Sequence, residues 1–167
     1  MRIMMAILLI LSAGGGGMAT DTIRVYDAAT NSYIDTPKVD KTPQQWKQQL
    51  TAIQYDVMRE QGTERPFTGE YVDNHRKGVY KCAACGLDLF RSEDKFESGT
   101  GWPSFVRPID KANVAYTTDV SLSEVRTEVH CPRCGAHLGH VFDDGPAPTG
   151  KRFCMNSAAL KFVEDKK

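Results

Sequence analysis

Four of the five cysteines in this 167-residue chain fall into two C-x-x-C pairs, and the fifth stands alone. The pairs are Cys82/Cys85, in K-C-A-A-C-G, and Cys131/Cys134, in H-C-P-R-C-G. The single cysteine is Cys154, in R-F-C-M-N. Thiolates bind soft metals and also act as nucleophiles. The spacing therefore predicts four metal ligands and one cysteine for chemistry.

Each pair is followed by glycine, which lets the backbone bend back and direct both sulfurs at one metal ion. Two such zinc knuckles supply the four ligands of a closed tetrahedral site. A closed site has no open position for a catalytic water, so the predicted zinc is structural and a zinc hydrolase is excluded. About 45 residues separate the knuckles, so the site is expected to join two distant hairpins. Two disulfides are the alternative, which an oxidising compartment would permit.

The neighbours of Cys154 suggest a reactive face. Side chains two positions apart in a strand point to the same side, so Arg152, Cys154 and Asn156 would share one face. Phe153 and Met155 would then face the core. A nearby guanidinium would lower the pKa of the Cys154 thiol, and Asn156 could orient a polar substrate group. Taken alone, a single cysteine is more often a small buried hydrophobic residue.

Two histidines, His137 and His140 in H-L-G-H, directly follow the second knuckle. With four sulfurs already available, they are not needed as metal ligands. Next to the Cys154 face they can form an acid/base pair near neutral pH. The alternative is two polar surface residues. Upstream, G-W-P-S-F places Trp102 in a tight turn, where it either packs into the core or forms the wall of a pocket.

A single helix is predicted from Thr42 to Gly62 to pack against the domain. Thr42 and Gln45 match the capping-box pattern at its start, and Gly62 would end it in a left-handed conformation. One apolar face recurs at spacings of four, three and four, formed by Trp46, Leu50, Ile53 and Val57.

After residue 62, frequent glycines and prolines separate short runs with β character, at 79–82, 87–90, 114–120, 125–130, 140–142 and from 153 onward. Val125, Thr127 and Val129 alternate with charged residues, a period typical of a half-buried strand. Several short strands with many turns indicate small antiparallel sheets.

The chain length suits one domain. Lys plus Arg and Asp plus Glu both number 21, so no charge footprint for nucleic acid or an anionic membrane is present. We expect a monomer.

The N-terminus has the layout of an export signal: Arg2, an apolar run at 3–11, then small residues. The run is too short for a membrane span, which needs roughly 20 residues. The expected organisation is a signal peptide at 1–19, an extended arm at 20–41 that could add one short strand, and a folded domain at 42–167. A genuine signal would make the protein periplasmic or secreted, whereas a start at Met18 would make it cytoplasmic.

From about Thr42 to Val163 the sequence resembles the B-type peptide methionine sulfoxide reductases, which act on the R epimer of methionine sulfoxide. The matching motifs are P-F-T-G-E-Y at 66–71, both knuckles, S-G-T-G-W-P-S-F at 98–105, H-C-P-R-C-G-A-H-L-G-H-V-F-D-D-G-P at 130–146 and R-F-C-M-N-S at 152–157. The resemblance implies a mainly β (α+β) fold of two small antiparallel sheets joined through one structural four-cysteine Zn²⁺ site, with the N-terminal helix packed alongside.

The resemblance also implies the roles of the site residues. Cys154 would attack the sulfoxide sulfur while a histidine, His140 in the first place, protonates the oxygen. Methionine would leave, and Cys154 would remain as a sulfenic acid. Trp102 and Phe142 would hold the substrate methyl group. The remaining residues around the nucleophile would be His137, Arg152 and Asn156.

One position departs from the family pattern. Many members carry a second, resolving cysteine in S-G-C-G-W-P-S-F, where this chain has Thr100. We therefore expect an external reductant, a thioredoxin-like protein or a small thiol, to regenerate Cys154. The alternative is a knuckle cysteine acting as resolver, which would endanger the metal. A non-catalytic zinc-knuckle domain that binds a protein partner is the competing function, but it would not need the Arg/Cys/Asn face or the histidine pair.

Overall fold

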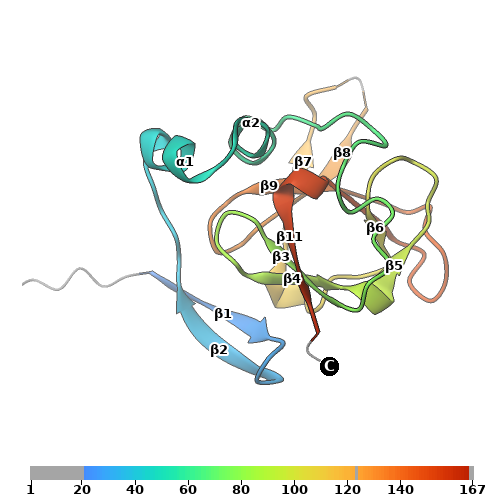
Figure 1. Ribbon diagram of the computed structural model, residues 1–167, viewed down its shortest axis with the longest axis horizontal. Coiled ribbons are helices and arrows are strands. Elements are labelled where there is room, and N and C mark those ends of the chain that lie inside the picture. The colour runs from blue at the N-terminus through green and yellow to red at the C-terminus, as the bar shows by residue number, and fades with distance from the viewer. Residues whose placement is uncertain (1–20, 123, 166–167) are drawn as a thin grey trace, which may run out of the picture.

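The computed structural model describes residues 21–122 and 124–165 (Figure 1). The predicted signal peptide at 1–19 lies outside these ranges. The elements are β1 (Thr22–Asp27), β2 (Ser32–Pro37), α1 (Pro43–Gln49), α2 (Ala52–Glu60), β3 (Gly78–Cys82), β4 (Asp88–Arg91), η1 (Ser92–Asp94), β5 (Lys95–Phe96), β6 (Ser104–Phe105), η2 (Lys111–Asn113), β7 (Ala115–Asp119), β8 (Arg126–His130), β9 (His137–Phe142), β10 (Arg152–Met155), η3 (Ser157–Ala159) and β11 (Leu160–Glu164).

The strands form antiparallel sheets, as predicted. The larger sheet has six strands in the order β5-β6-β10-β9-β8-β7, and a second has three in the order β11-β3-β4. The β1–β2 hairpin forms a third sheet by itself. The mainly β fold with helices alongside is therefore confirmed, with one sheet larger than expected.

The core lies between the six-stranded and three-stranded sheets. Tyr80 and Phe90 of the smaller sheet meet Phe105 of the larger, with ring centroids 5.1 and 4.4 Å apart respectively. Phe153 of β10 adds a third contact, 5.9 Å from Phe90. All four rings are buried. The strand that carries Cys154 is thus fixed from behind by aromatic packing.

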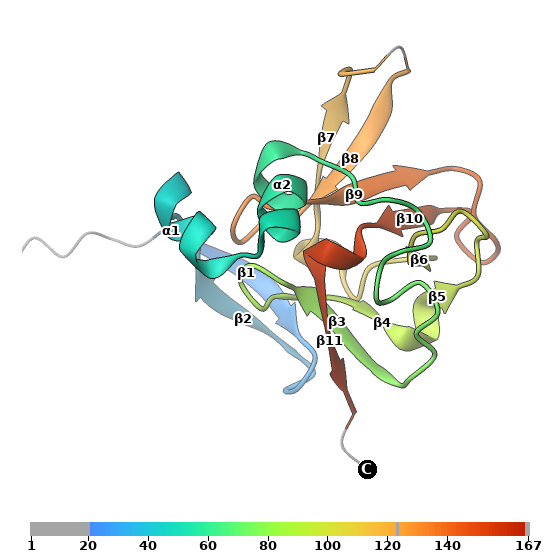
Figure 2. The same ribbon diagram turned by 45° about the horizontal axis from the view of Figure 1, so that its top comes forward.

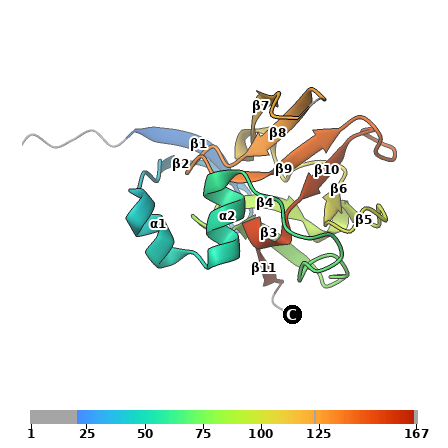
Figure 3. The same cartoon turned by 90° about the horizontal axis from the view of Figure 1, so that it is seen from above.

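The single predicted helix is in fact two, which Figure 3 shows as separate coils α1 and α2. The chain becomes extended at Leu50, and Thr51 begins a second capping box with Gln54. The break turns Ile53 outward, so its place on one apolar face was wrong. Gln61, not Gly62, adopts the left-handed conformation that ends α2. The start at Thr42 with its capping box to Gln45 is confirmed.

The predicted arm is a complete hairpin, β1–β2, rather than one short strand (Figures 1 and 2). Val25 is its buried contact with the core. The Asn113 amide ties the hairpin to the domain, accepting from Tyr26 N and donating to Tyr26 O, each at 2.8 Å.

The half-buried alternation predicted for 125–130 is only partly right. Val125 precedes β8 and is 72% exposed, whereas Val129 is buried. Glu128, expected on the solvent side, is also buried, because it pairs with His137. None of the helices in the described ranges has the length and apolar character needed to cross a bilayer.

Candidate active site and metal centre

The four knuckle cysteines converge in one cluster. Their sulfurs all lie within 4.8 Å of one another, with Cys82 to Cys134 at 3.7 Å and Cys85 to Cys131 at 3.5 Å. Four sulfurs at tetrahedral corners, each about 2.3 Å from zinc, lie about 3.8 Å apart. The separations therefore fit a shared metal ion. A disulfide would need about 2.05 Å, so the alternative of two disulfides is wrong.

Each knuckle is a tight turn at the end of a hairpin. Gly86 N and Gly135 N donate to the carbonyls of Cys82 and Cys131, each at 2.8 Å, and both glycines have a positive φ. The first knuckle joins β3 to β4 and the second joins β8 to β9, so the cluster clasps the two sheets together. This confirms the predicted link between distant hairpins.

The helices bind the same turns from outside. Arg59 of α2 donates twice to the Cys134 carbonyl, at 3.0 and 2.8 Å, and Gln49 of α1 donates to Ala84 O at 2.5 Å. Each knuckle backbone is therefore held by a helix as well as by its own hairpin.

Cys154 lies in the middle of the six-stranded sheet. Its backbone partners are Ser104 on β6 and His140 on β9. A pocket of about 120 Å³ opens beside it. The pocket is lined by Thr63, Trp102, Arg126, Gly139, His140, Phe142, Cys154, Met155 and Asn156. Five of the seven residues predicted for catalysis or substrate binding thus meet here.

Gly139 allows β9 to lie very close to the backbone of β10 at Cys154 and Met155. A Cβ at this position would lie 2.1 Å from Cys154 O and 3.0 Å from Met155 Cα, closer than any side chain can be placed. The glycine of H-L-G-H therefore makes room for the strand that carries Cys154.

The expected low pKa of Cys154 is wrong. Burial of the half-buried thiol raises its pKa above the usual value, and this effect outweighs the opposing influence of Arg152, Thr100 and Ser104. The reason is position: Cys154 is surrounded by packed strands, and desolvation disfavours the charged thiolate.

His140 is held by a carboxylate that sequence reasoning missed. Its Nε2 lies 2.7 Å from Asp119 Oδ2, and the same oxygen accepts from Arg126 at 2.6 Å. Burial lowers the pKa of His140, while Asp119 opposes this shift. Two hydrogen bonds from Ser121 and one from His140 hold the pKa of Asp119 well below its usual range.

His137 lies behind His140 and does not line the pocket. Its Nδ1 is 2.7 Å from Glu128 Oε1, and the ring centroids of the two histidines are 5.3 Å apart. Both His137 and Glu128 are buried. The reading of the pair as two surface residues is therefore wrong.

Arg152 is committed to other partners. It donates two hydrogen bonds of 2.9 Å to Asp144, and its guanidinium stacks 4.4 Å from the centroid of the Phe142 ring. Asp144, the largest influence, raises the pKa of Arg152. Arg152 thus fixes Phe142 against one side of the pocket.

A second missed carboxylate, Glu64, supports the opposite side. Its backbone carbonyl accepts from Trp102 Nε1 at 3.1 Å, and its backbone N–H donates to Asn156 Oδ1 at 3.1 Å. Its carboxylate accepts from Ser157 N at 2.5 Å and Ala158 N at 2.8 Å. Trp102 is therefore a pocket wall held rigidly by its indole N–H.

Asn156 was predicted to share the face of Cys154 within one strand. Strand β10 ends at Met155, so Asn156 lies just beyond it. It still lines the pocket, but its side chain binds Glu64 N and, at 3.2 Å, Leu138 O.

Thr100, at the position where many members of the family that the sequence resembles carry a second cysteine, lies next to Cys154. Thr100 Oγ1 is 3.9 Å from Cys154 Sγ and 2.8 Å from Ser98 Oγ. A hydroxyl, not a thiol, therefore lies beside Cys154 at this position.

The fold and the two cysteine sites together define a small β domain in which four cysteines cluster as a possible metal site and a fifth lies apart in a pocket. Comparison with known proteins gives the family. The SelR domain matches residues 50–164 of this chain. The chain belongs to this family, the B-type peptide methionine sulfoxide reductases.

Relatives named "Peptide methionine sulfoxide reductase MsrB" are similar along most of the chain. The protein from Hahella chejuensis is 59% identical over 125 residues, covering 75% of this chain and 90% of its own length. That from Bradyrhizobium diazoefficiens is 56% identical over 135 residues, covering 81% and 96%. That from Methanosarcina barkeri is 58% identical over 124 residues, covering 74% and 87%.

Proposed function

We propose that this protein reduces the R epimer of methionine sulfoxide in oxidised peptides and proteins, with Cys154 as its nucleophile. The observation that carries the proposal is the pocket itself, which brings a free thiol, an imidazole and two aromatic walls together. Membership of the reductase family supports the same reaction.

In the first step the Cys154 thiolate attacks the sulfoxide sulfur while His140 gives a proton to the sulfoxide oxygen. The bond between that oxygen and the substrate sulfur breaks, and the hydroxyl transfers to Cys154. The substrate sulfur gains the two electrons that Cys154 loses. Sulfoxide and thiol thus become methionine and a sulfenic acid.

The substrate side chain would lie between Trp102 and Phe142. Its methyl group and sulfur would contact the aromatic rings, an interaction that sulfur makes at about 5 Å. Asn156 supports this arrangement by fixing the Glu64 segment that holds Trp102.

Regeneration of Cys154 would need two external thiol groups. The first attacks the sulfenic acid, releasing water and leaving a mixed disulfide, and the second displaces Cys154 from it. A thioredoxin-like protein or a small dithiol supplies both. Thr100 at the neighbouring position supports this route, since a hydroxyl cannot form a disulfide.

The four-cysteine cluster would hold one structural Zn²⁺. Its all-sulfur donor set and tetrahedral spacing suit zinc, which would stabilise the fold and take no part in the reaction.

We also propose that residues 1–19 direct export, which would make the protein periplasmic or secreted. A reporter fused after residue 20 should then be exported. A reporter found only in the cytoplasm would end this proposal.

The decisive experiment compares wild-type protein with Cys154→Ser, using R and S epimers of a methionine sulfoxide peptide. We expect turnover of the R epimer only, lost in the variant while its fold and zinc content are kept. After one turnover without reductant, mass spectrometry should find a single added oxygen on Cys154. Equal turnover by Cys154→Ser would refute the assignment, and an intramolecular disulfide would refute the external-reductant route.

A further inference from the structure

The β7–β8 hairpin directs two carboxylates at the two histidines of β9. Asp119, the last residue of β7, binds His140, and Glu128, in the middle of β8, binds His137. Each contact is 2.7 Å long. Sheet pairing brings them together, because Glu128 lies directly opposite His140 in the β8–β9 ladder.

The two carboxylates hold opposite nitrogens. Glu128 contacts Nδ1 of His137, whereas Asp119 contacts Nε2 of His140. A neutral imidazole carries one proton, and the carboxylate determines which nitrogen keeps it. His137 should therefore be protonated at Nδ1 and His140 at Nε2.

The nitrogen of His137 that Glu128 does not contact is Nε2. Among the described residues, His137 Nε2 is buried and has no hydrogen-bond partner. His137 does not line the pocket beside Cys154, so its ring acts through the ring of His140, whose centroid lies 5.3 Å away.

We propose that Asp119 and Glu128 are positioning residues. Asp119 holds the Nε2 side of His140, which leaves Nδ1 to carry the proton that the imidazolium form gives to the sulfoxide oxygen. Glu128 fixes the ring of His137, which packs against that of His140. The inference rests on the proposed function, because it takes that oxygen as the ligand. Neither carboxylate touches the substrate; each acts through its histidine.

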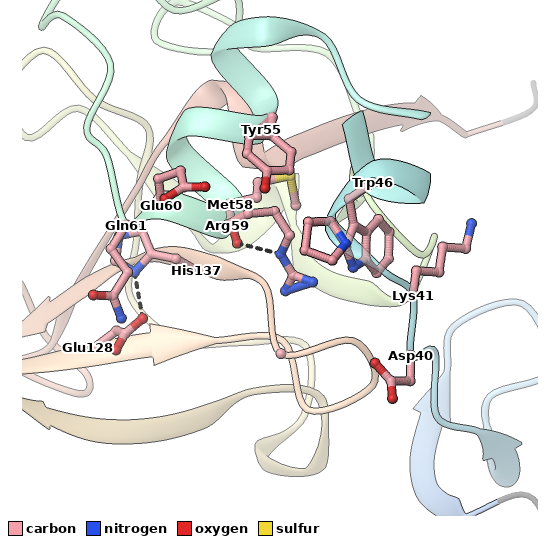
Figure 4. Close-up of a pocket in the computed structure, with 12 residues that line it drawn as sticks. Asp40, Lys41, Trp46, Tyr55, Met58, Arg59, Glu60, Gln61, Glu128 and His137 are labelled. Carbon is pink, nitrogen blue, oxygen red and sulfur yellow. Dashed lines mark hydrogen bonds and ion pairs between the residues drawn. The ribbon is translucent and has the colours of Figure 1, made fainter. Parts of the chain in front are cut away.

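The two carboxylates lie in different surroundings. Arg126 and the Ser121 backbone N–H, at 2.6 and 2.9 Å, bind Asp119 and fix its direction. Glu128 faces a cleft of about 570 Å³ between the helices and the second knuckle (Figure 4). The figure shows the Glu128–His137 contact at one end of this cleft and Trp46, with Arg59 stacked on it at 4.7 Å, farther along.

The charged and titratable groups around the two histidines come from several elements. Those around His140 are Asp119, Arg126, His137 and Cys154. Those that line the cleft with His137 are Asp40, Lys41, Tyr55, Arg59, Glu60 and Glu128. Only Asp119 and Glu128 form hydrogen bonds with the histidines in the part of the chain that the structure describes.

The kinetic test uses Asp119→Asn and Glu128→Gln, which keep shape but remove charge. Glu97→Gln is the matched control, because Glu97 faces His75 at 3.9 Å on the surface. We expect kcat for the R-sulfoxide peptide to fall about 10²-fold in each test variant, with KM within twofold. In Asp119→Asn the acid limb of kcat/KM should also move down by about one pH unit, since a paired charge is lost. Asp119→Glu should restore part of the activity.

A second measurement does not depend on turnover. Nitrogen-15 NMR of the wild-type protein, at a pH where both histidines are neutral, should show His137 protonated at Nδ1 and His140 at Nε2. Replacement of either carboxylate by Ala should change the tautomer of the histidine that it binds. Like tautomers in the wild type would overturn the inference, as would wild-type kcat in both amide variants. Absence of turnover in the wild type would instead refute the proposed function, and the NMR result would still decide the positioning role.

Discussion

Cys154 and His140 face one another across β9 and β10, and the same burial moves their pKa values in opposite directions. The pKa of the thiol is raised above 9.0 and that of the imidazole is lowered below 6.5. Between these values both groups are neutral in most molecules, so the reactive thiolate–imidazolium pair is the minor form. The fraction of molecules in this form does not change with pH between the two pKa values. A rise in pH increases the thiolate fraction by the same factor by which it decreases the imidazolium fraction.

This predicts the shape of the pH dependence. We expect kcat/KM to be flat over a wide range, with an acid limb below pH 6.5 that reports His140 and an alkaline limb above pH 9.0 that reports Cys154. Stopped-flow measurement of Cys154 oxidation across this range checks it. A rate that climbs steadily from pH 6 to 9 with thiol ionisation would contradict it.

Thr100 gives a second prediction at this scale. Its hydroxyl lies 3.9 Å from Cys154 Sγ, so a thiol there is within reach of the sulfenic acid. In Thr100→Cys we expect one turnover without reductant to end in a disulfide between the introduced thiol and Cys154, two hydrogens lighter than the reduced protein. Thr100→Ser is the control and should end with one added oxygen. Sulfenic acid in both variants would show that the loop cannot bring the sulfurs together.

At the scale of elements, the break between α1 and α2 determines how the helices reach the knuckles. Thr51 begins α2 by accepting from Gln54 N at 3.3 Å, and α2 carries the arginine that binds the second knuckle. Thr51→Ala should lower stability by about 1 kcal/mol and the melting temperature by about 3 °C. Thr51→Ser keeps the cap and should melt with the wild type. Equal melting of all three proteins would show that the cap contributes nothing measurable.

The sequence predicted those features that local patterns encode. The knuckles, the cap at Thr42 and the single cysteine of the pocket each have their signal within a few residues. The second cap has the same signal, T-A-I-Q at 51–54, but the apolar spacing across it favoured one continuous helix.

The network around the histidines had no comparable local signal. Asp119 and Glu128 reach their histidines through cross-strand register, and Glu64 reaches Asn156 across 92 positions. The pKa of Cys154 was misjudged for the same reason, because burial depends on strands that lie far apart in the chain.

At the scale of the whole molecule, the cysteine cluster joins the hairpins of two sheets. Zinc binding to such sites is worth about 10–16 kcal/mol in small peptides, which is as large as the total stability of a typical domain. Removal of the metal by a chelator should therefore unfold the protein. Thermal melting followed by circular dichroism checks this.

Two cysteine variants separate the metal site from the active site. Cys85→Ser should lose zinc and the cooperative melting transition, whereas Cys154→Ser should keep both. A metal-free protein with an unchanged melting temperature would rule out the structural role.

The second knuckle is also the turn of the hairpin that carries both histidines. The first end of β9 is thus held by the cysteine cluster and by the two hydrogen bonds from Arg59. Its other end continues into the connection at 143–151. Amide protons near His137 should exchange with deuterium only when the whole domain opens, and those near Phe142 through local fraying. The pocket would then be rigid on the side of the histidines and able to move on the side of the 143–151 connection, which suits an enzyme that must accept methionines in many sequence contexts.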